Sequence, residues 1–270
     1  MTTTTGAFRE AREAVGATLT EGDDDVAMVV EVVRSLAEVD PAAWDALLPP
    51  HNPFVEHAFL SLLETSQSAV AETGWQPLHL VVRDEDRLVG AAPCYLKSHS
   101  QGEYIFDYAW AEAAMRAGLD YYPKLVVGVP LTPATGPRLL ARDDERRPLV
   151  WRALVEGLVA LTHEADAGGA HVLFSLPEEA AFLEEHGFLR RATHQFHWRN
   201  HNYRNFDDFL GALKSQARKQ IRKERRAVSE AGLTVELRRG DELSADEWST
   251  LFALYQHTGS RKWGTPYLTR

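Results

Sequence analysis

The chain has 270 residues and a formal net charge of −10, from 29 Lys and Arg against 39 Asp and Glu. A protein that coats DNA is basic over its whole surface, so this acidic balance argues against DNA as a partner. The single cysteine, Cys94, excludes an internal disulfide framework and a cysteine metal cluster, and the apolar runs are too short to cross a bilayer, so we expect a cytoplasmic protein without a membrane span.

Residues 1–25 are rich in threonine and acidic residues, which is typical of a disordered leader. Residues 26–203 alternate between strand and helix patterns, and this order predicts an α/β domain with a mixed sheet. The elements expected there are, in chain order, a strand over 26–33, helices over 41–48 and 53–64, strands over 78–83, 88–97 and 103–110, a helix over 109–118, a strand over 124–129, a helix over 148–165, a strand over 171–176, a helix over 177–186 and one or two strands over 188–198.

A second unit is predicted over residues 204–270. Asn205 caps its first helix, which runs to a stop at Gly232, and a strand over 233–238 and a helix opened by Ser244 follow. One strand and two helices leave the ladder groups of the strand unpaired, so they cannot close a sheet of their own. Either this unit shares the sheet of the first domain, or it is a truncated product.

Positive charge is concentrated in residues 190–226, which carry eleven Lys and Arg against three acidic residues, whereas the rest of the chain carries 18 basic and 36 acidic residues. The basic residues of the helix in this segment cover a wide surface opposite its apolar stripe. Such segregation indicates a local anionic partner, and a solvated helix face is the plainer alternative. The residues expected to receive the phosphates of a carrier are Lys214, Arg218, Lys219, Arg222, Lys223 and Arg225.

Candidate proton acceptors lie in and before the third strand expected in the meander. Glu103 and Asp107 are four apart and therefore face the same side of a strand, with His99 just upstream. The residues placed to orient a substrate carboxylate or diphosphate are Tyr121, Tyr122 and Lys124. For all of them an exposed strand residue or a buried, hydrogen-bonded tyrosine is the alternative.

The sequence predicts neither a metal site nor a nucleophile. Three histidines, His194, His197 and His201, lie close together, but positions 194 and 197 of a strand point to opposite faces and cannot share an ion without a bulge. Cys94 lies in an apolar strand without a neighbouring base, and the chain has no Gly-x-Ser-x-Gly elbow. A covalent enzyme intermediate is therefore not expected.

Five sequence blocks resemble a known bacterial family. They are Tyr95–Asp107, Tyr121–Leu125, Pro130–Leu140, His194–Trp198 and Lys262–Arg270. Together they resemble the peptidoglycan biosynthesis proteins of the GNAT acyltransferase superfamily, which are related to the Fem-type aminoacyltransferases of peptidoglycan cross-bridges. The resemblance covers nearly all of residues 26–270. It implies a GNAT-like domain over 26–203 and a second, incomplete GNAT-like unit over 204–270, because members of the family continue beyond this point.

The resemblance also implies a reaction, the transfer of an acyl or aminoacyl group from a phosphorylated carrier to the amine of a small molecule such as a peptidoglycan precursor. The carrier, acyl-CoA or aminoacyl-tRNA, is a co-substrate, and no permanently bound cofactor is implied. GNAT enzymes cradle pyrophosphate in a glycine-rich loop, whereas the matching loop here has one glycine and prolines that lack N–H groups, so it either lines the substrate or is a packed turn. The residues expected to line the substrate are Thr132, Thr135, Arg138 and Trp263. A non-catalytic RNA-binding module that uses the basic helix 205–231 is the alternative to an enzyme.

Overall fold

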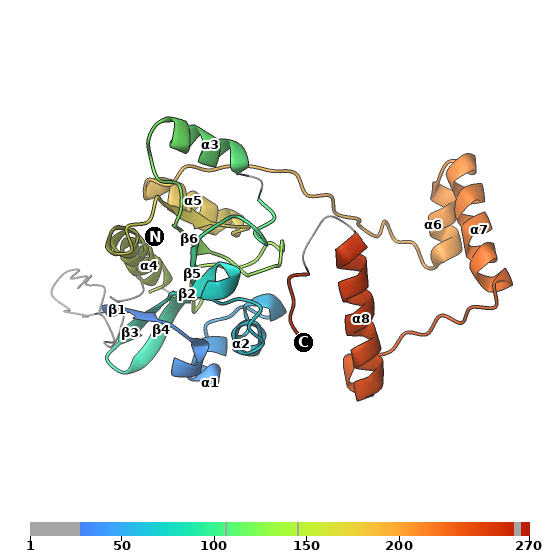
Figure 1. The fold of residues 1–270 in the computed structure, drawn as a ribbon, viewed down its shortest axis with the longest axis horizontal. Helices are drawn as coiled ribbons and strands as arrows, with labels where there is room; N and C mark the ends of the chain where they lie inside the picture. The colour runs from blue at the N-terminus through green and yellow to red at the C-terminus, as the bar shows by residue number, and fades with distance from the viewer. Residues whose placement is uncertain (1–27, 106, 145, 262–265) are drawn as a thin grey trace. The chain divides into compact units, whose positions relative to one another are not determined.

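The computed structural model describes residues 28–105, 107–144, 146–261 and 266–270 (Figure 1). The leader expected over 1–25 and the predicted substrate residue Trp263 lie outside the described residues. The chain divides into two compact units, which are Met1–Arg190 with Thr265–Arg270 and Arg191–Gly264. The domain boundary expected after residue 203 stays a prediction.

The first sheet of unit 1 is antiparallel. It contains β1 (Met28–Val33), β3 (His79–Asp84), β4 (Arg87–Ala92) and β7 (Leu140–Ala141), in the order β1-β3-β4-β7. The strand expected at 26–33 is confirmed for its described residues, and the hairpin expected over 78–97 is confirmed for β3 and β4. The second arm of that hairpin is divided at Pro93, because a proline has no N–H group with which to continue the ladder.

The second sheet of unit 1 is mixed. It contains β2 (Trp75–Pro77), β5 (Cys94–Lys97), β6 (Lys124–Val127) and β8 (Ala170–Val172), in the order β2-β5-β6-β8. Only the β6 and β8 pair is parallel, and the long helix α4 (Arg147–Glu164) lies in the connection that a parallel pair requires. The α/β class with a mixed sheet, predicted from the alternating pattern, is therefore confirmed.

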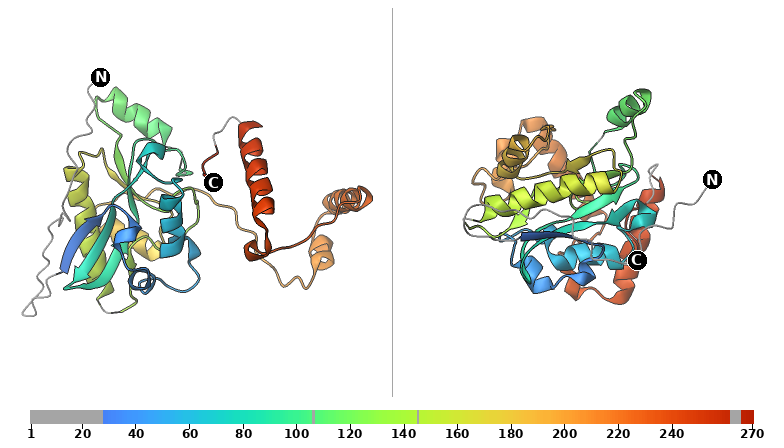
Figure 2. Two further views of the ribbon diagram at one scale, coloured as in Figure 1. Left: turned by 60° about the horizontal axis from the view of Figure 1, so that its bottom comes forward. Right: turned by 90° about the vertical axis from the view of Figure 1, so that its left-hand side faces the viewer.

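Helices cover both sides of the sheets, as the right-hand view of Figure 2 shows. On one side α4 buries Leu154 and Leu158 in a core shared with Val30 and Val82. On the other side Trp44 and the residues around it form a second core. The remaining helices of unit 1 are α1 (Pro41–Asp45), α2 (His57–Thr65), α3 (Tyr108–Arg116) and α5 (Pro177–Glu185), with 3₁₀ turns η1 (Leu36–Glu38), η2 (Pro53–Val55) and η3 (Ala71–Thr73).

Three of the expected strands are wrong. Residues 103–105 and 107 form a loop and α3 begins at Tyr108, because positive φ angles at Gly102 and Tyr104 turn the chain away from an extended course. Residues 188–198 and 233–238 have no regular secondary structure. A strand is stable only when a neighbour pairs with its N–H and C=O groups, and no described strand lies beside either segment.

The regular secondary structure described in unit 2 is helical, with α6 (Phe206–Ala212), α7 (Ser215–Glu230), the 3₁₀ turn η4 (Gly240–Glu242) and α8 (Ala245–Arg261). The cap at Asn205 is confirmed, since its side chain accepts the N–H of Asp208 at 2.9 Å. The single helix expected over 205–231 is wrong, because Leu213 is extended and divides it into α6 and α7. The capping box at Ser244 is also confirmed by its reciprocal hydrogen bonds with Glu247.

The C-terminal segment 266–270 belongs to unit 1. The Thr269 hydroxyl lies 3.0 Å from the Ser68 hydroxyl, which also accepts the Thr269 N–H at 3.1 Å. Tyr267 packs edge to face against Tyr104, with ring centroids 6.3 Å apart. The segment therefore packs against Ser68, which follows α2, and against Tyr104, which lies beside the predicted proton acceptor Glu103.

Candidate active site

The strand register of the second sheet places two lysines side by side. Lys97 of β5 is the direct partner of Lys124 of β6, and Trp75 of β2 is the partner of Lys97 on its other side. Residues opposite one another in neighbouring strands point to the same face of the sheet, so these three side chains form one row. Both lysines are fully buried, although lysine is almost never buried without partners.

Lys124 is held by a network of buried acceptors, the Lys124 cluster. Its Nζ donates to Glu103 Oε2 at 2.8 Å, to Asp107 Oδ2 at 2.5 Å and to Ser100 Oγ at 2.9 Å, so all three of its hydrogens are used. Both carboxylates are buried, with 3% of Glu103 and 1% of Asp107 exposed. A buried ammonium group needs such hydrogen-bonded carboxylates, because its transfer from water to the protein interior otherwise costs on the order of several kcal/mol.

Two tyrosines complete the cluster. The Tyr121 hydroxyl donates to Asp107 Oδ2 at 2.7 Å, and the Tyr122 hydroxyl lies 2.7 Å from Ser100 Oγ. The structure thus joins Tyr121, Tyr122 and Lys124, predicted to orient a substrate, with Glu103 and Asp107, predicted to accept a proton. The two carboxylates meet because Glu103 and Asp107, which do not lie in a strand, both contact Lys124 of β6. The strand alternation that first suggested their common side is not the cause.

The two carboxylates of the cluster differ in electrostatic environment. Burial raises the pKa of Glu103, and the attraction of Lys124 offsets this only in part. For Asp107 burial acts in the same direction, but the hydrogen bonds it accepts, led by the one from Lys124, outweigh it and the pKa is lowered. Glu103 Oε1 and Asp107 Oδ1 are buried and have no hydrogen-bond partner in the part of the chain that the structure describes. Glu103 is therefore the better proton acceptor at neutral pH, because its conjugate acid is the weaker acid.

His99, the third predicted proton acceptor, lies apart from this network. Its ring packs against Gly74, and its Nδ1 accepts the N–H of Gln101 at 3.2 Å. Partial burial and the nearby Lys97 lower its pKa. Among the described residues it forms no hydrogen bond with Glu103 or Asp107.

The loop predicted to line a substrate is anchored by Arg138. The guanidinium of this buried residue donates to the carbonyls of Leu173 at 2.7 Å, Pro137 at 2.9 Å and Ala134 at 2.6 Å, and burial lowers its pKa to about 10. These carbonyls account for the burial of Arg138 without a substrate. Thr132 is half-buried and Thr135 is exposed. The structure does not bring these two threonines into the Lys124 cluster.

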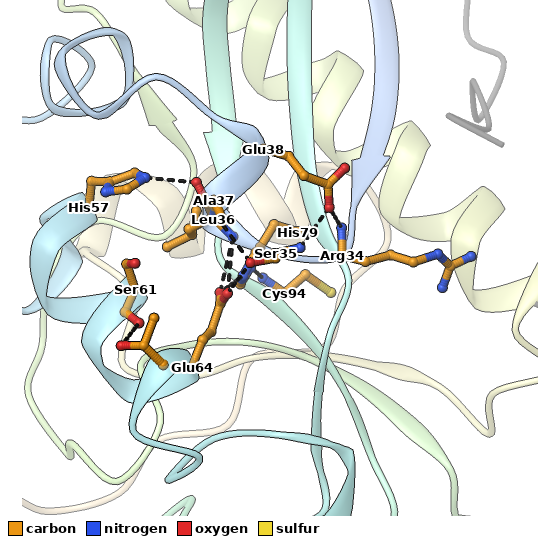
Figure 3. Close-up of polar contacts among 11 residues, drawn as sticks. Arg34, Ser35, Leu36, Ala37, Glu38, His57, Ser61, Glu64, His79 and Cys94 are labelled. Atoms are coloured by element: carbon orange, nitrogen blue, oxygen red, sulfur yellow. Dashed lines mark hydrogen bonds and ion pairs between the residues drawn. The ribbon is translucent and has the colours of Figure 1, made fainter. Parts of the chain in front are cut away.

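A second buried network, formed around Glu64, was not predicted from the sequence. The Glu64 carboxylate accepts hydrogen bonds from the Ser35 hydroxyl at 2.8 Å, the Leu36 N–H at 3.1 Å and His79 Nε2 at 2.9 Å (Figure 3). His79 Nδ1 accepts the N–H of Cys94 at 3.2 Å, so its proton is on Nε2. These contacts hold η1, α2, β3 and β5 together, and their sequence separations, up to 29 residues, leave no local signal.

A hollow of about 330 Å³ lies beside the turn between β3 and β4. Its charged lining comes from Arg83, Arg87, Arg142, Asp40 and Asp86. None of the residues predicted from the sequence to carry function lines it. Burial raises the pKa of the Cys94 thiol to about 12, so this side chain is a poor nucleophile at neutral pH.

The predicted phosphate-binding residues lie in unit 2, at the N-cap of α7 and along that helix. Arg218 is half-buried and the other five are exposed. Arg222 lies 4.0 Å from Asp207, and Arg225 stacks on Phe206 with its guanidinium carbon 4.4 Å from the ring centroid. Within the described part of the chain the others have no ion-pair partner; they are Lys214, Arg218, Lys219 and Lys223.

The fold and these sites define a mixed α/β protein with a buried, charged cluster in one unit and a cationic helix in the other. The family model described as peptidoglycan biosynthesis/recognition, FemAB-like, matches residues 35–270, and the chain belongs to this family. The family suggests a Fem-type aminoacyltransferase of peptidoglycan biosynthesis. A search of curated proteins gives no match.

No described helix combines the length and the apolar character that crossing a membrane requires. In the part of the chain that the structure describes, no group of three or more His, Cys, Asp or Glu residues is placed to hold a metal ion, and this includes His194, His197 and His201.

Proposed function

We propose that this protein is an acyltransferase of the GNAT and Fem type. It transfers an acyl or aminoacyl group from a phosphorylated carrier, acyl-CoA or aminoacyl-tRNA, to the amine of a small molecule such as a peptidoglycan precursor. Family membership supports aminoacyl transfer as the chemistry. The GNAT-like arrangement of the first domain and of the second unit is part of the proposal.

The observation that carries the proposal is the cationic surface of α7. Both kinds of carrier have several phosphates in common, and an array of unpaired cations is what binds them. Ordinary surface helices gain stability by alternating charges at i and i+4. In α7 the one acidic residue among the basic ones, Glu224, accepts a hydrogen bond from Gln220 and forms no ion pair with a described residue. Lys214, Arg218, Lys219 and Lys223, which have no ion-pair partner among the described residues, are therefore available to a ligand.

The Lys124 cluster of unit 1 suits the other half of the reaction. An amine is a nucleophile only after it has lost a proton, so the site needs an acceptor whose conjugate acid is weak. Glu103 fits this need, since burial raises its pKa and its Oε1 has no partner within the described residues. We assign Glu103 as the group that takes the proton from the acceptor amine, with Lys124 holding its other oxygen in place.

Binding of the carrier to the full chain tests the role of α7. We expect the wild type to bind acetyl-CoA or aminoacyl-tRNA in isothermal titration calorimetry, and the variant with Arg218→Glu and Arg222→Glu to lose at least about tenfold in affinity, since charge-assisted contacts to phosphate are worth about 1.5 to 3 kcal/mol each. The matched control is Arg116→Glu with Arg239→Glu, which changes the net charge equally at exposed arginines outside α7. Equal affinity of the two double variants would remove α7 from the mechanism.

A non-catalytic RNA-binding module is the second candidate, favoured by the segment before α6. Phe196 is 99% exposed and Trp198 is 68% exposed, and exposed aromatic rings near cations are typical of surfaces on which bases stack. This function predicts that uncharged tRNA and unstructured RNA bind as well as aminoacyl-tRNA. It also predicts an affinity that falls with salt by about one logarithmic unit of slope per phosphate contacted. Preference for the aminoacylated form would favour the transferase.

A further inference from the structure

Lys97 and Lys124 are buried side by side, and the acceptors around them compensate the charge of Lys124 better than that of Lys97. Two ammonium groups on directly opposed positions repel each other strongly in a buried environment, where little water screens them. Lys124 donates to two carboxylates. Lys97 donates to one main-chain carbonyl, that of Gln101 at 3.1 Å, and its Nζ lies 3.7 Å from the centroid of the Trp75 ring.

The balance of these interactions makes a neutral Lys97 accessible near pH 7. The Trp75 ring and Glu103 favour its charged form, whereas burial and Lys124 oppose it. Burial is the largest of these effects and lowers the pKa of Lys97 to about 7. His99 of the loop also lies near Lys97, and Tyr95 shares its face of β5; among the described residues neither adds a hydrogen bond to the Lys97 Nζ.

A neutral Lys97 changes the charge of the whole site. With both carboxylates ionised, Lys124, Glu103 and Asp107 then leave a buried net charge of −1. Two of their carboxylate oxygens, Glu103 Oε1 and Asp107 Oδ1, have no donor among the described residues. Buried carboxylate oxygens without donors are rare in folded proteins, because their desolvation is not compensated. A ligand that matches one negative charge and two free acceptor oxygens is a cation with several N–H groups.

We propose that Glu103 and Asp107 bind the primary ammonium group of the acceptor substrate and that Lys97 is the neutral amine that stores its proton. This inference rests on the proposed acyl transfer for its catalytic meaning. The acceptor is then a primary amine that enters in its protonated form. Lys97, for which the strand pattern alone indicates no function, takes part in the proton transfer.

The proton balance of the reaction is complete without a cofactor. The ammonium gives one proton to Glu103, which passes it to Lys97, so that Glu103 is again a carboxylate and Lys97 an ammonium. The free amine then attacks the carbonyl carbon of the carrier ester or thioester. A C–N bond forms, the C–O or C–S bond breaks, and the second amine proton leaves with the alcohol or thiol. Lys97 returns its proton to solvent.

The protonation of Lys97 is measurable without any reaction. The chain has six lysines, so the NMR spectrum of the full-length protein labelled with ¹³Cε-lysine is sparse enough to assign each signal by substitution. We expect one signal to titrate with a midpoint at about 7 and to be absent from Lys97→Met. If all six signals titrate only at strongly alkaline pH, the inference is wrong. It is also wrong if the signal that titrates near neutral pH is present in Lys97→Met and missing from Lys124→Met, because that signal would then belong to Lys124.

The ammonium site is tested with methylammonium chloride as the probe. A bound cation beside Lys97 makes its charged form less favourable, so excess methylammonium should move the midpoint of Lys97 to lower pH. Tetramethylammonium chloride at the same ionic strength is the control, because it has the charge but no N–H donors. The shift should be lost in Glu103→Gln. An equal response to both salts, or no response to either, would contradict the ammonium site.

The catalytic role has its own test, with a transferase assay on the carrier that binds α7. Lys97→Met should lower kcat by about 100-fold to 10,000-fold and abolish the fall in rate on the acidic side of neutrality, while the affinity for the carrier stays unchanged. An unchanged acidic limb would refute the proton store. Failure of the carrier to bind would refute the proposed function instead, and the NMR titrations would still decide the state of Lys97.

Discussion

Replacement of Lys124 by methionine tests whether the Lys124 cluster is an ion-paired site. Methionine keeps most of the length of the side chain but removes the charge that Glu103 Oε2 and Asp107 Oδ2 share at 2.8 Å and 2.5 Å. Removal of one partner from a buried pair costs about 3 to 5 kcal/mol, because the remaining charge is buried and uncompensated. We expect a loss of this size in the free energy of unfolding at about pH 7, measured by urea denaturation.

The loss of stability caused by Lys124→Met should depend on pH. The folded-state pKa of Asp107 is lowered, so its stabilising contribution is present above its unfolded pKa of about 3.9 and is lost as the pH falls through the folded value. Burial raises the pKa of Glu103, so Glu103 becomes neutral at higher pH than Asp107. Without Lys124 both carboxylates protonate more easily, and the loss caused by Lys124→Met should shrink between about pH 7 and pH 4.

The matched control for this experiment is Arg116→Met in α3. It also removes a cation from an ion pair, with Glu112, but both of these side chains are exposed. A surface pair at i and i+4 is worth about 0.3 to 0.5 kcal/mol. A loss below about 1 kcal/mol for Lys124→Met, or a loss that does not change with pH, would refute the view of the site as a buried charge cluster.

Two further substitutions test the frame that holds this site. Glu64→Gln should destabilise the protein by about 2 to 4 kcal/mol at neutral pH, because the carboxylate accepts hydrogen bonds from three donors, and thermal unfolding would measure this. Since the pKa of Glu64 is lowered despite its burial, the difference should vanish as the pH falls through its folded pKa, and persistence in acid would contradict the assignment. Gly157→Ala should cost about 1 to 3 kcal/mol, because the new Cβ would lie 2.7 Å from Val30 Cγ1. Gly211→Ala in α6, where a Cβ meets nothing within 4 Å, should instead stabilise by up to about 1 kcal/mol, and equal changes would show that packing against Val30 is not the cause.

Glu103 and Asp107 were selected from the sequence for a reason that the structure does not bear out. Glu103 and Asp107 attracted attention as neighbours on a strand, but the residues around them form a loop and the start of α3. Their carboxylates converge because Lys124 donates to both. A local pattern can identify residue types suited to chemistry, whereas the distance between positions 103 and 124 depends on how a loop folds over a sheet.

Other parts had no signal in the sequence. Lys97 looks like the polar end of an apolar strand, and only its register against Lys124 shows that two lysines are opposed in a buried row. The contact of Glu64 with His79 likewise depends on the packing of α2 against β3. Conversely, the strands expected over 188–198 and 233–238 are absent, because β-propensity acts only where a neighbouring strand supplies partners.

The sequence by itself determined the α/β class, the hairpin of β3 and β4 and the concentration of positive charge on α7, because alternation, turn residues and charge spacing act over a few neighbouring residues. Only the tertiary structure decided that Lys97, Lys124, Glu103 and Asp107 share one buried site. Register across strands and burial depend on contacts between distant parts of the chain. The ionisation of each group then follows from the charges that the fold brings beside it.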